Sequence, residues 1–242
     1  MKNFGLLGKN IDYSFSRGFF KDKFETEKLE CSYKNFDLET IEDFENLKNS
    51  TQLSGLNVTI PYKQEVIPYL DAIDLEAQDI GAVNTIKIKN GKLTGYNTDH
   101  FGFEHSLKPH LKPHHKRALI LGTGGASKAI AYALKKLGIQ FDYVSRTQSN
   151  AVKYTYESLA DKGIEDYHII VNCTPLGTYP DVTKCPQIPY NQITSNHLLF
   201  DLIYNPEETL FLKKGKNNNA TILNGLQMLR LQAEKSWELW NS

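Results

Sequence analysis

The sequence predicts an α/β protein of two lobes, with a mixed sheet in the first lobe and a parallel sheet in the second. Strand-like and helix-like hydrophobic periods alternate along most of the 242 residues, as they do where helices connect parallel strands. The Pro- and His-rich stretch "KPHLKPHHK" interrupts this alternation and cannot form one continuous helix. We therefore predict a first lobe of residues 1–100, on which residues 226–242 pack, and a second lobe of residues 101–225.

The first lobe begins with strands and helices in alternation. "NFGLLG" and "CSYKNF" have the composition of strands. "SFSRGFFKDKFETEKL" and "ETIEDFENLKN" have helical periods, and in the first of them Phe15, Phe19 and Phe20 are expected to face inward. This order indicates that the strands are parallel.

The rest of the first lobe should contain a proline-bounded helix and a hairpin. After the strand "GLNVTI", Pro61 can occupy the first turn of a helix that continues through "YKQEVIPYLDAI" and that Pro68 distorts. Alternating isoleucines then lead into Asn90-Gly91, the favoured pair for a two-residue hairpin turn. An antiparallel edge of the sheet is therefore expected.

The second lobe repeats the alternation. "RALILG" reads as a buried strand, and "ASKAIAYALKKLG" reads as an amphipathic helix closed by Gly138. "FDYVSRT", "YHIIVNCTP", "LLFDLIYNP" and "ATILNG" are four more candidate strands. The last helix, "LQMLRLQAEKSWELW", must pack on a large surface, because it carries an apolar stripe of Leu226, Leu229, Ala233, Trp237 and Trp240.

The composition excludes several classes of partner. Lys plus Arg and Asp plus Glu number 28 each, so no net field attracts nucleic acid or an anionic membrane, and a small molecule is expected. The 3 cysteines form no Cys-x-x-Cys pair, which argues against disulfides and zinc and fits a cytoplasmic protein. No apolar run of about 18 residues is present, and because the apolar run in "MKNFGLLGKNIDYSFSR" is very short, the protein is expected not to be exported. The proline-broken region around His100, His105, His110, His114 and His115 is expected to be a solvated connector and not a metal site.

A glycine-rich turn is the first sign of a ligand. "LILGTGGASKAI" places Gly122, Gly124 and Gly125 between a buried strand and an amphipathic helix, with Ser127 at the third small position. Glycine lets the backbone approach a pyrophosphate, and the N–H groups at the helix start face that anion. A Rossmann-like dinucleotide-binding lobe is the prediction, and a tight turn without a ligand is the alternative.

The end of the following strand indicates which dinucleotide binds. An acidic residue there would favour NAD, because it would bind the ribose hydroxyls and repel a 2′-phosphate. This strand ends instead in Ser145-Arg146-Thr147, a guanidinium between two hydroxyls. Since a guanidinium pairs well with phosphate, NADP(H) is the predicted cofactor, and an ordinary surface arginine is the alternative.

Lys63 stands one proline-bounded turn after the strand "GLNVTI", where ligands of open sheets collect. A second strand ends in "GYNTD", which carries Asp99, and "GAVNTI" contributes Asn84. A lysine beside an aspartate can hold and transfer a proton, so the pair would suit reduction of a carbonyl. The alternative is a solvated surface lysine, which is the commoner situation for a lysine at a strand end.

Two serines suggest a carboxylate-binding corner. In "YSFS", Ser14 and Ser16 are two residues apart, so both hydroxyls share one face of an extended chain or lie at the start of the next helix. The alternative is that one of them only caps that helix.

These motifs together resemble the shikimate dehydrogenase family, which reduces 3-dehydroshikimate to shikimate with NADPH. The likeness covers nearly the whole chain in the same order. It consists of "YSFS", "NVTIPYK", "GAVNTI", "GYNTD", "LGTGGASKAI", "SRT", "VNCTPLGTYP", "DLIYNPEETLFL" and "NGLQMLRLQA".

The resemblance implies roles for particular residues. Lys63 and Asp99 correspond to the catalytic pair, and Ser14 and Ser16 to the residues that hold the substrate carboxylate. Further substrate contacts correspond to Asn57, Thr59, Asn84, Tyr204 and Gln232. The cofactor positions correspond to Gly122, Thr123, Gly124, Gly125 and Ala126 at the pyrophosphate, Ser145, Arg146 and Thr147 at the 2′-phosphate, and Thr174, Leu202 and Gly225 near the nicotinamide. The family also implies two lobes, with the final helix returning to the first.

The chain departs from the family pattern at Asn10, Tyr13 and Arg17, beside the carboxylate corner, and the segment after Thr147 is short. Three alternatives stay open: a quinate dehydrogenase of the same family, a non-catalytic NADP or shikimate sensor, and a folate-linked dehydrogenase. A sensor would be expected to lose Lys63 or Asp99, and a folate-linked enzyme would not explain "YSFS" or the aspartate of "GYNTD". A monomer or a homodimer is expected.

Overall fold

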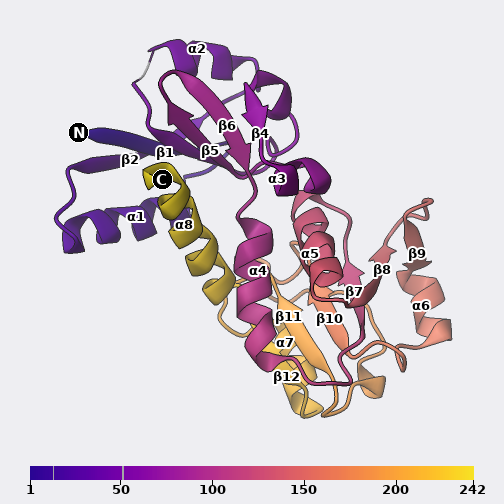
Figure 1. The fold of residues 1–242 in the computed structure, drawn as a ribbon. Helices are drawn as coiled ribbons and strands as arrows, with labels where there is room; N and C mark the ends of the chain where they lie inside the picture. Colours follow the sequence, from indigo (N-terminus) through magenta and orange to yellow (C-terminus); the bar gives the residue numbers. More distant parts are fainter. Residues whose placement is uncertain (13, 51) are drawn as a thin grey trace. The chain divides into compact units, whose positions relative to one another are not determined.

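The computed structural model describes residues 1–12, 14–50 and 52–242. The chain divides into two compact units, Met1–Gly102 with Leu229–Ser242, and Phe103–Met228 (Figure 1). Each unit contains one six-stranded sheet, which confirms the predicted α/β class. Which unit binds substrate and which binds cofactor stays a prediction.

The sheet of the first unit is mixed. Its strand order is β2-β1-β3-β5-β6-β4, in which β1 is parallel to β2 and β3, and β5 is antiparallel to β3 and β6. The elements are β1 (Lys2–Gly8), α1 (Phe15–Thr26), β2 (Cys31–Asp37), α2 (Asp43–Ser50), β3 (Gly55–Val58), β4 (Ala72–Ile73), α3 (Leu75–Ile80), β5 (Thr85–Lys89), β6 (Lys92–Tyr96) and the start of α4 (Asp99–Leu107).

The predicted hairpin is confirmed, but it is not the edge of the sheet. Asn90 and Gly91 connect β5 to β6 with φ of 53° and 75°, the left-handed conformation that a two-residue hairpin turn requires at both positions. The two-residue strand β4 then pairs with β6 in parallel and forms the edge.

The helix predicted from Tyr62 to Ile73 is wrong. The segment consists of turns followed by a 3₁₀ helix, η1 (Ile67–Tyr69), and β4. The Lys63 carbonyl accepts a hydrogen bond from Val83 N–H at 2.7 Å instead of bonding four residues ahead, and Pro68 has no N–H to donate. A tertiary contact therefore replaces the helical hydrogen bond and holds the backbone of Lys63 beside Asn84.

The predicted inward face of α1 needs correction. Phe20 and Phe24 are buried, whereas Phe15 and Phe19 are only half-buried. Phe20 lies against Trp240 with ring centroids 5.2 Å apart, and both rings belong to a cluster that includes Phe4. Burial against the returning helix selects the i, i+4 pair Phe20 and Phe24.

Most of the final helix, α8 (Leu226–Asn241), belongs to the first unit, which includes residues 229–242 and not the segment 226–242 of the prediction. Trp240 stacks on Phe4 at 4.7 Å, and its indole N–H donates to the Ile86 carbonyl at 3.0 Å. The predicted apolar stripe was partly wrong, because Leu226, Leu229 and Trp237 are only half-buried. The buried face of this part of α8 is instead formed by Gln232, Ala233, Ser236 and Trp240.

The second unit has a fully parallel sheet in the order β12-β11-β10-β7-β8-β9. Its elements are the rest of α4, η2 (Lys108–His110), β7 (Arg117–Leu121), α5 (Gly125–Lys136), β8 (Gln140–Ser145), β9 (Val152–Thr155), α6 (Tyr156–Lys162), β10 (Ile169–Asn172), η3 (Tyr190–Gln192), β11 (Leu198–Asp201), α7 (Leu210–Asn217) and β12 (Thr221–Leu223). The strand order reverses between β7 and β10, and in such sheets ligands bind at the carboxyl ends of the strands beside that reversal.

Besides the 3₁₀ helices, six elements were not predicted: β4, α3, α4, β9, α6 and α7. None is longer than nine residues, so their hydrophobic periods are weak. Three of the four helices, α3, α6 and α7, nevertheless begin with a capping side chain, Asp74, Thr155 or Thr209, that accepts a hydrogen bond from the first turn. These capping residues were the signal in the sequence from which α3, α6 and α7 could have been predicted.

Candidate active site

Lys63 and Asp99 lie side by side in the first unit. Lys63 Nζ donates to Asp99 Oδ2 at 2.7 Å, and the two side chains are 16% and 10% exposed. Asp99 is the first residue of α4, and its backbone N–H donates to the Asn97 side chain at 3.1 Å. The sequence placed both groups at strand ends, and the structure brings them into direct contact in a largely water-excluded position.

Asn84 holds the other oxygen of the Asp99 carboxylate. Asn84 Nδ2 donates to Asp99 Oδ1 at 2.8 Å, and Asn84 Oδ1 accepts from the backbone N–H of Thr98 at 2.7 Å. Because a backbone N–H can only donate, the Thr98 contact determines which way the amide of Asn84 faces. Gln232 approaches the same amide from α8, with its Oε1 3.5 Å from Asn84 Nδ2.

The predicted carboxylate-binding residues are close in sequence, but the structure shows different surroundings for each. Ser14 is the N-cap of α1 and accepts from Arg17 N–H at 3.4 Å. Ser16 is half-buried and hydrogen-bonds the Tyr33 phenol. Burial raises the pKa of Tyr33, and the hydrogen bond from Ser16 opposes that rise.

Three further substrate candidates differ in accessibility. Thr59 follows β3 and is half-buried. Asn57 is 4% exposed, and both of its polar atoms have protein partners. Tyr33 Oη donates to Asn57 Oδ1 at 2.8 Å, and Asn57 Nδ2 donates to Ser236 Oγ at 3.0 Å. Tyr204 belongs to the second unit and is 36% exposed. Asn57 therefore supports the site from behind.

Two of the three positions at which the sequence departs from the motif pattern can be described. Asn10 has a left-handed φ of 57°, and its N–H donates to Asp37 Oδ1 at 3.0 Å. The Arg17 guanidinium donates to the Asp12 carbonyl at 3.0 Å. Tyr13 lies outside the described residues.

The glycine turn of the second unit borders a cavity of about 300 Å³. Gly122 has φ of 98°, and a Cβ there would lie 3.1 Å from Cγ2 of Thr174. A Cβ at Gly124 or Gly125 would meet no described atom within 4 Å, so the backbone beside the start of α5 is open to a ligand. The cavity is lined by Gly122, Thr123, Gly124, Ser145, Arg146, Tyr156, Cys173, Thr174, Pro175 and Leu176.

Two side chains make this cavity suitable for an anionic, partly aromatic ligand. Arg146 is exposed and forms no hydrogen bond or ion pair within residues 1–12, 14–50 and 52–242. The Tyr156 hydroxyl is buried, and no described group hydrogen-bonds it. Burial raises the pKa of Tyr156 to about 12, and the charge of Arg146 acts in the opposite direction. A cation and a hydroxyl, neither with a described hydrogen-bond partner, thus border the same cavity, and Thr147, the residue after Arg146, is exposed.

A buried hydrogen-bond chain supports the ends of β10 and β11. Asp201 accepts from Thr209 Oγ1 at 2.6 Å and from Asn172 Nδ2 at 3.0 Å. Asn172 Oδ1 in turn accepts from Thr174 Oγ1 at 2.7 Å, which orients the predicted cofactor residue Thr174.

The predicted cofactor residues Leu202 and Gly225 are in direct contact. A Cβ at Gly225 would lie 2.0 Å from the Leu202 carbonyl oxygen, so only glycine permits this approach. The structure therefore brings Leu202 and Gly225 together just beyond β11 and β12.

We expect Asp201 to make stability fall as pH rises. Burial raises the pKa of Asp201 to about 6, against opposing hydrogen bonds from Thr209, Ile203 N–H and Asn172. The folded state thus binds this proton more tightly than the unfolded state, and the resulting stabilisation is complete below pH 4 and lost as pH passes 6. The loss corresponds to about 3 kcal/mol. Urea unfolding at pH 5 and pH 8 should show a smaller decline for Asp201→Asn than for the parent, and equal declines would contradict this assignment.

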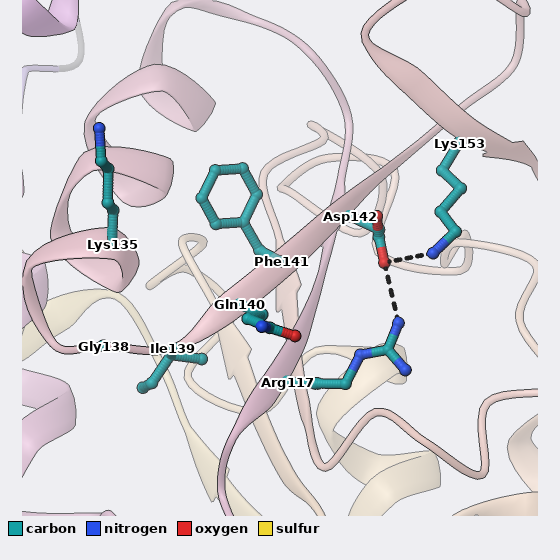
Figure 2. A pocket seen from close by; sticks show the side chains of 8 residues that line it. All are labelled: Arg117, Lys135, Gly138, Ile139, Gln140, Phe141, Asp142 and Lys153. Carbon is teal, nitrogen blue, oxygen red and sulfur yellow. Dashed lines mark hydrogen bonds and ion pairs between the residues drawn. The ribbon is translucent and has the colours of Figure 1, made fainter.

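A second hollow of the second unit, of about 580 Å³, lies at the opposite ends of the strands, where β7 and β8 begin (Figure 2). Asp142 accepts there from Lys153 at 2.9 Å and from Arg117 at 3.2 Å, as the dashed lines in Figure 2 show. Burial would raise the pKa of Asp142, but hydrogen bonds from Tyr167 and Lys153 outweigh it and lower the pKa. Because Asp142 already pairs with Lys153 and Arg117, we interpret these side chains as ion pairs that connect β7, β8 and β9, and not as a ligand-binding site.

The histidine region is less solvated than predicted. His115 and His100 are both 4% exposed, and the His115 ring contacts the Asn196 carbonyl at 3.2 Å. Within the described part of the chain, no three His, Cys, Asp or Glu side chains are placed to hold a metal. None of the described helices combines the length and apolar character needed to cross a membrane.

Fold and site define a class of protein. One unit carries a lysine–aspartate pair, and the other carries a Rossmann-type glycine turn followed by an arginine at the end of the second strand. These are the parts of a nicotinamide-dependent oxidoreductase acting on an alcohol or a carbonyl.

The chain belongs to the shikimate dehydrogenase family. Residues 6–86 match the family model for the shikimate dehydrogenase substrate binding domain. A shikimate dehydrogenase (NADP(+)) of Methanococcus vannielii is 38% identical over 257 residues, covering 98% of this chain and 90% of that protein. These matches confirm the family inferred from the motifs.

Two solved structures extend the likeness to the fold. Shikimate 5-dehydrogenase from Thermus thermophilus, in complex with NADP(H) and shikimate, is 31% identical with a TM-score of 0.86, covering 99% of this chain and 93% of that one. Quinate dehydrogenase from Corynebacterium glutamicum, in complex with NAD, is 27% identical with a TM-score of 0.87 over the same shares of 99% and 93%.

Sequence reasoning did not single out three polar groups of these sites. Ser236 is fully buried beside Asn57, Asp201 is fully buried behind Thr174, and the Tyr156 hydroxyl is buried at the cofactor cavity. A serine on the buried face of α8, four residues after Gln232, was the one signal that could have been read. The other two depend on contacts between distant segments.

Proposed function

We propose that this protein catalyses the NADPH-dependent reduction of 3-dehydroshikimate to shikimate, on the route to chorismate and the aromatic amino acids. The observation that carries the proposal is the 2.7 Å contact between Lys63 Nζ and Asp99 Oδ2, with Asn84 on the other carboxylate oxygen. Family membership over 98% of the chain supports the choice of substrate.

In this proposal Lys63 delivers a proton from Nζ to the oxygen of the ring ketone, and Asp99 keeps the ammonium group aimed at that oxygen. Bound NADPH supplies the hydride. General acid catalysis by a positioned side chain typically contributes about 10²–10⁴ in rate. The low exposure of the pair keeps water from competing for the same hydrogen bonds.

The remaining assignments rest on the family resemblance. Ser14 and Ser16 bind the ring carboxylate, and the ring hydroxyls are bound by Thr59, Asn84, Tyr204 and Gln232 with Asn57 behind them. The pyrophosphate binds at Gly122, Thr123, Gly124, Gly125 and Ala126, the 2′-phosphate at Ser145, Arg146 and Thr147, and the nicotinamide half near Thr174, Leu202 and Gly225.

The test is absorbance at the reduced-nicotinamide band after the protein is mixed with shikimate and NADP⁺. We expect shikimate-dependent reduction of NADP⁺, with a lower kcat/KM for NAD⁺ because only NADP⁺ offers Arg146 a phosphate. The Lys63→Ala protein provides the matched background. Absence of any shikimate-dependent signal with either cofactor would contradict the proposal.

Quinate is the second candidate substrate, because a quinate dehydrogenase is among the proteins with this fold, at a TM-score of 0.87. That protein is 27% identical, against 38% for the shikimate dehydrogenase of Methanococcus vannielii. Steady-state rates on both acids distinguish the two, and we expect a higher kcat/KM for shikimate. The protein is expected to be cytoplasmic. It is also expected to be a monomer or a homodimer, and sedimentation would distinguish these two states.

A further inference from the structure

Ser236 occupies an unexpected place on α8. It is 0% exposed on a helix face otherwise formed by Gln232, Ala233 and Trp240. Its hydroxyl donates to the Gln232 carbonyl at 2.9 Å, the back-bond with which a serine inside a helix satisfies its hydrogen. With the hydrogen used, both lone pairs of Oγ face outward from α8 toward the sheet.

Three side chains from other segments converge on this oxygen. Asn57 Nδ2 lies 3.0 Å from Ser236 Oγ, Thr85 Oγ1 lies 2.8 Å away, and Thr98 Oγ1 lies 3.2 Å away. Each belongs to a different part of the first unit, β3, β5 or the residue before α4, and Thr85 and Thr98 are 0% and 1% exposed. Ser236 is therefore the common acceptor of a buried polar cluster.

The same two threonines also reach Asn84. Thr85 Oγ1 and Thr98 Oγ1 lie 3.1 Å and 3.2 Å from Asn84 Oδ1, which already accepts the Thr98 N–H. Each hydroxyl has one hydrogen, so one threonine can donate to Asn84 while the other donates to Ser236. Without Ser236, the two hydroxyls would be left with Asn84 Oδ1, with each other at 3.3 Å and with the longer contact from Thr98 to Gln232 Oε1 at 3.4 Å. The Asn57 amide would lose its 3.0 Å acceptor.

We propose that Ser236 is a positioning residue of the reaction, whose hydroxyl holds the Asn84 amide against Asp99 through Thr85 and Thr98. Asn84 Nδ2 donates to Asp99 Oδ1 at 2.8 Å, and Asp99 Oδ2 accepts from Lys63 at 2.7 Å, so the arrangement reaches the proton-transferring pair in two further contacts. From Ser236 the hydrogen bonds also continue in the other direction, through Asn57 to Tyr33, which contacts Ser16. This proposal rests on the proposed function.

The decisive comparison is Ser236→Thr against Ser236→Val. The two side chains have nearly the same shape, so any crowding is shared and only the hydroxyl differs. We expect kcat for shikimate oxidation to be roughly tenfold higher for Ser236→Thr, the factor that corresponds to one buried hydrogen-bonding group left without its partner. The KM for NADP⁺ should be equal in both variants. Equal kcat values would overturn the proposal.

Further variants separate positioning from stability. Ser106→Ala removes a buried serine whose hydroxyl bonds a backbone carbonyl within α4, and it should leave kcat unchanged. Thr85→Val should lower kcat as Ser236→Val does, and the double variant should be no slower than the slower single variant. If the kcat losses of the two single variants multiply in the double variant, Ser236 does not act through Thr85. If the Ser236 variants do not fold, the kcat of Thr85→Val alone tests the same path.

The outcomes for the two proposals are distinguishable. A parent protein without shikimate-dependent turnover overturns the proposed function and with it the role of Ser236. An active parent with equally active Ser236→Thr and Ser236→Val variants overturns only the role of Ser236.

Discussion

Replacing Lys63 with alanine should lower kcat for shikimate by about 10²–10⁴, while the KM for shikimate changes much less. In the proposed mechanism, the Lys63 amine accepts the proton that leaves the shikimate hydroxyl during oxidation, the reverse of its role in the reduction, whereas several other side chains share in binding the substrate. Lys63 has the geometry for this role, because its Nζ is held 2.7 Å from Asp99 Oδ2 and the side chain is 16% exposed. Initial rates over a range of shikimate concentrations measure both constants.

A second variant distinguishes proton transfer from charge alone. Lys63→Arg keeps a cation near Asp99, but a guanidinium does not release its proton near neutral pH, so kcat should stay low. Lys92→Ala, at an exposed lysine of the β5–β6 hairpin, is the control and should behave as the parent. Parent-like turnover of Lys63→Ala would remove the lysine from the mechanism.

Replacing Arg146 with alanine should raise the KM for NADP⁺ roughly 10- to 100-fold, since a hydrogen bond to a charged group contributes about 1.5–3 kcal/mol. Arg146 lines the cavity beside Gly122 and Gly124 and, among the residues that the structure describes, has no partner of its own. Its guanidinium is thus available for two parallel hydrogen bonds to the 2′-phosphate. Steady-state kinetics with NADP⁺ and NAD⁺ provide the measurement.

NAD⁺ serves as the internal control for this variant. It lacks the 2′-phosphate, so its KM should change little when Arg146 is replaced. A variant that weakens both cofactors equally would show that Arg146 acts on a part they share, and a parent that uses both cofactors equally well would contradict the phosphate argument.

The local signals of the sequence were enough for the architecture and for the main chemical groups. Hydrophobic periods predicted both sheets, Asn90-Gly91 predicted the hairpin, and the glycines of "LGTGGAS" predicted the turn into α5. Each of these features depends on residues within a few positions of one another, because hydrophobic period and backbone conformation are local properties. The order of the motifs then identified the family.

The conformation around Lys63 could not be predicted in this way. The residues after Pro61 favour a helix, but Val83 takes the Lys63 carbonyl and the segment becomes a series of turns. The same limit applies to α1, where Trp240 decides which phenylalanines are buried. In both cases a partner far along the chain outweighs local preference, and short-range patterns carry no information on that partner.

By itself, therefore, the sequence determined the α/β class, the family and the chemical types at the site: an ammonium, a carboxylate, paired hydroxyls and a glycine turn. The tertiary structure alone decided which of these groups touch. Ser236 meets Asn57 across 179 positions of sequence, and Gln232 meets Asn84 across 148. The physical reason is that a buried polar group must find a hydrogen-bond partner, and packing of distant segments determines which partner lies within reach.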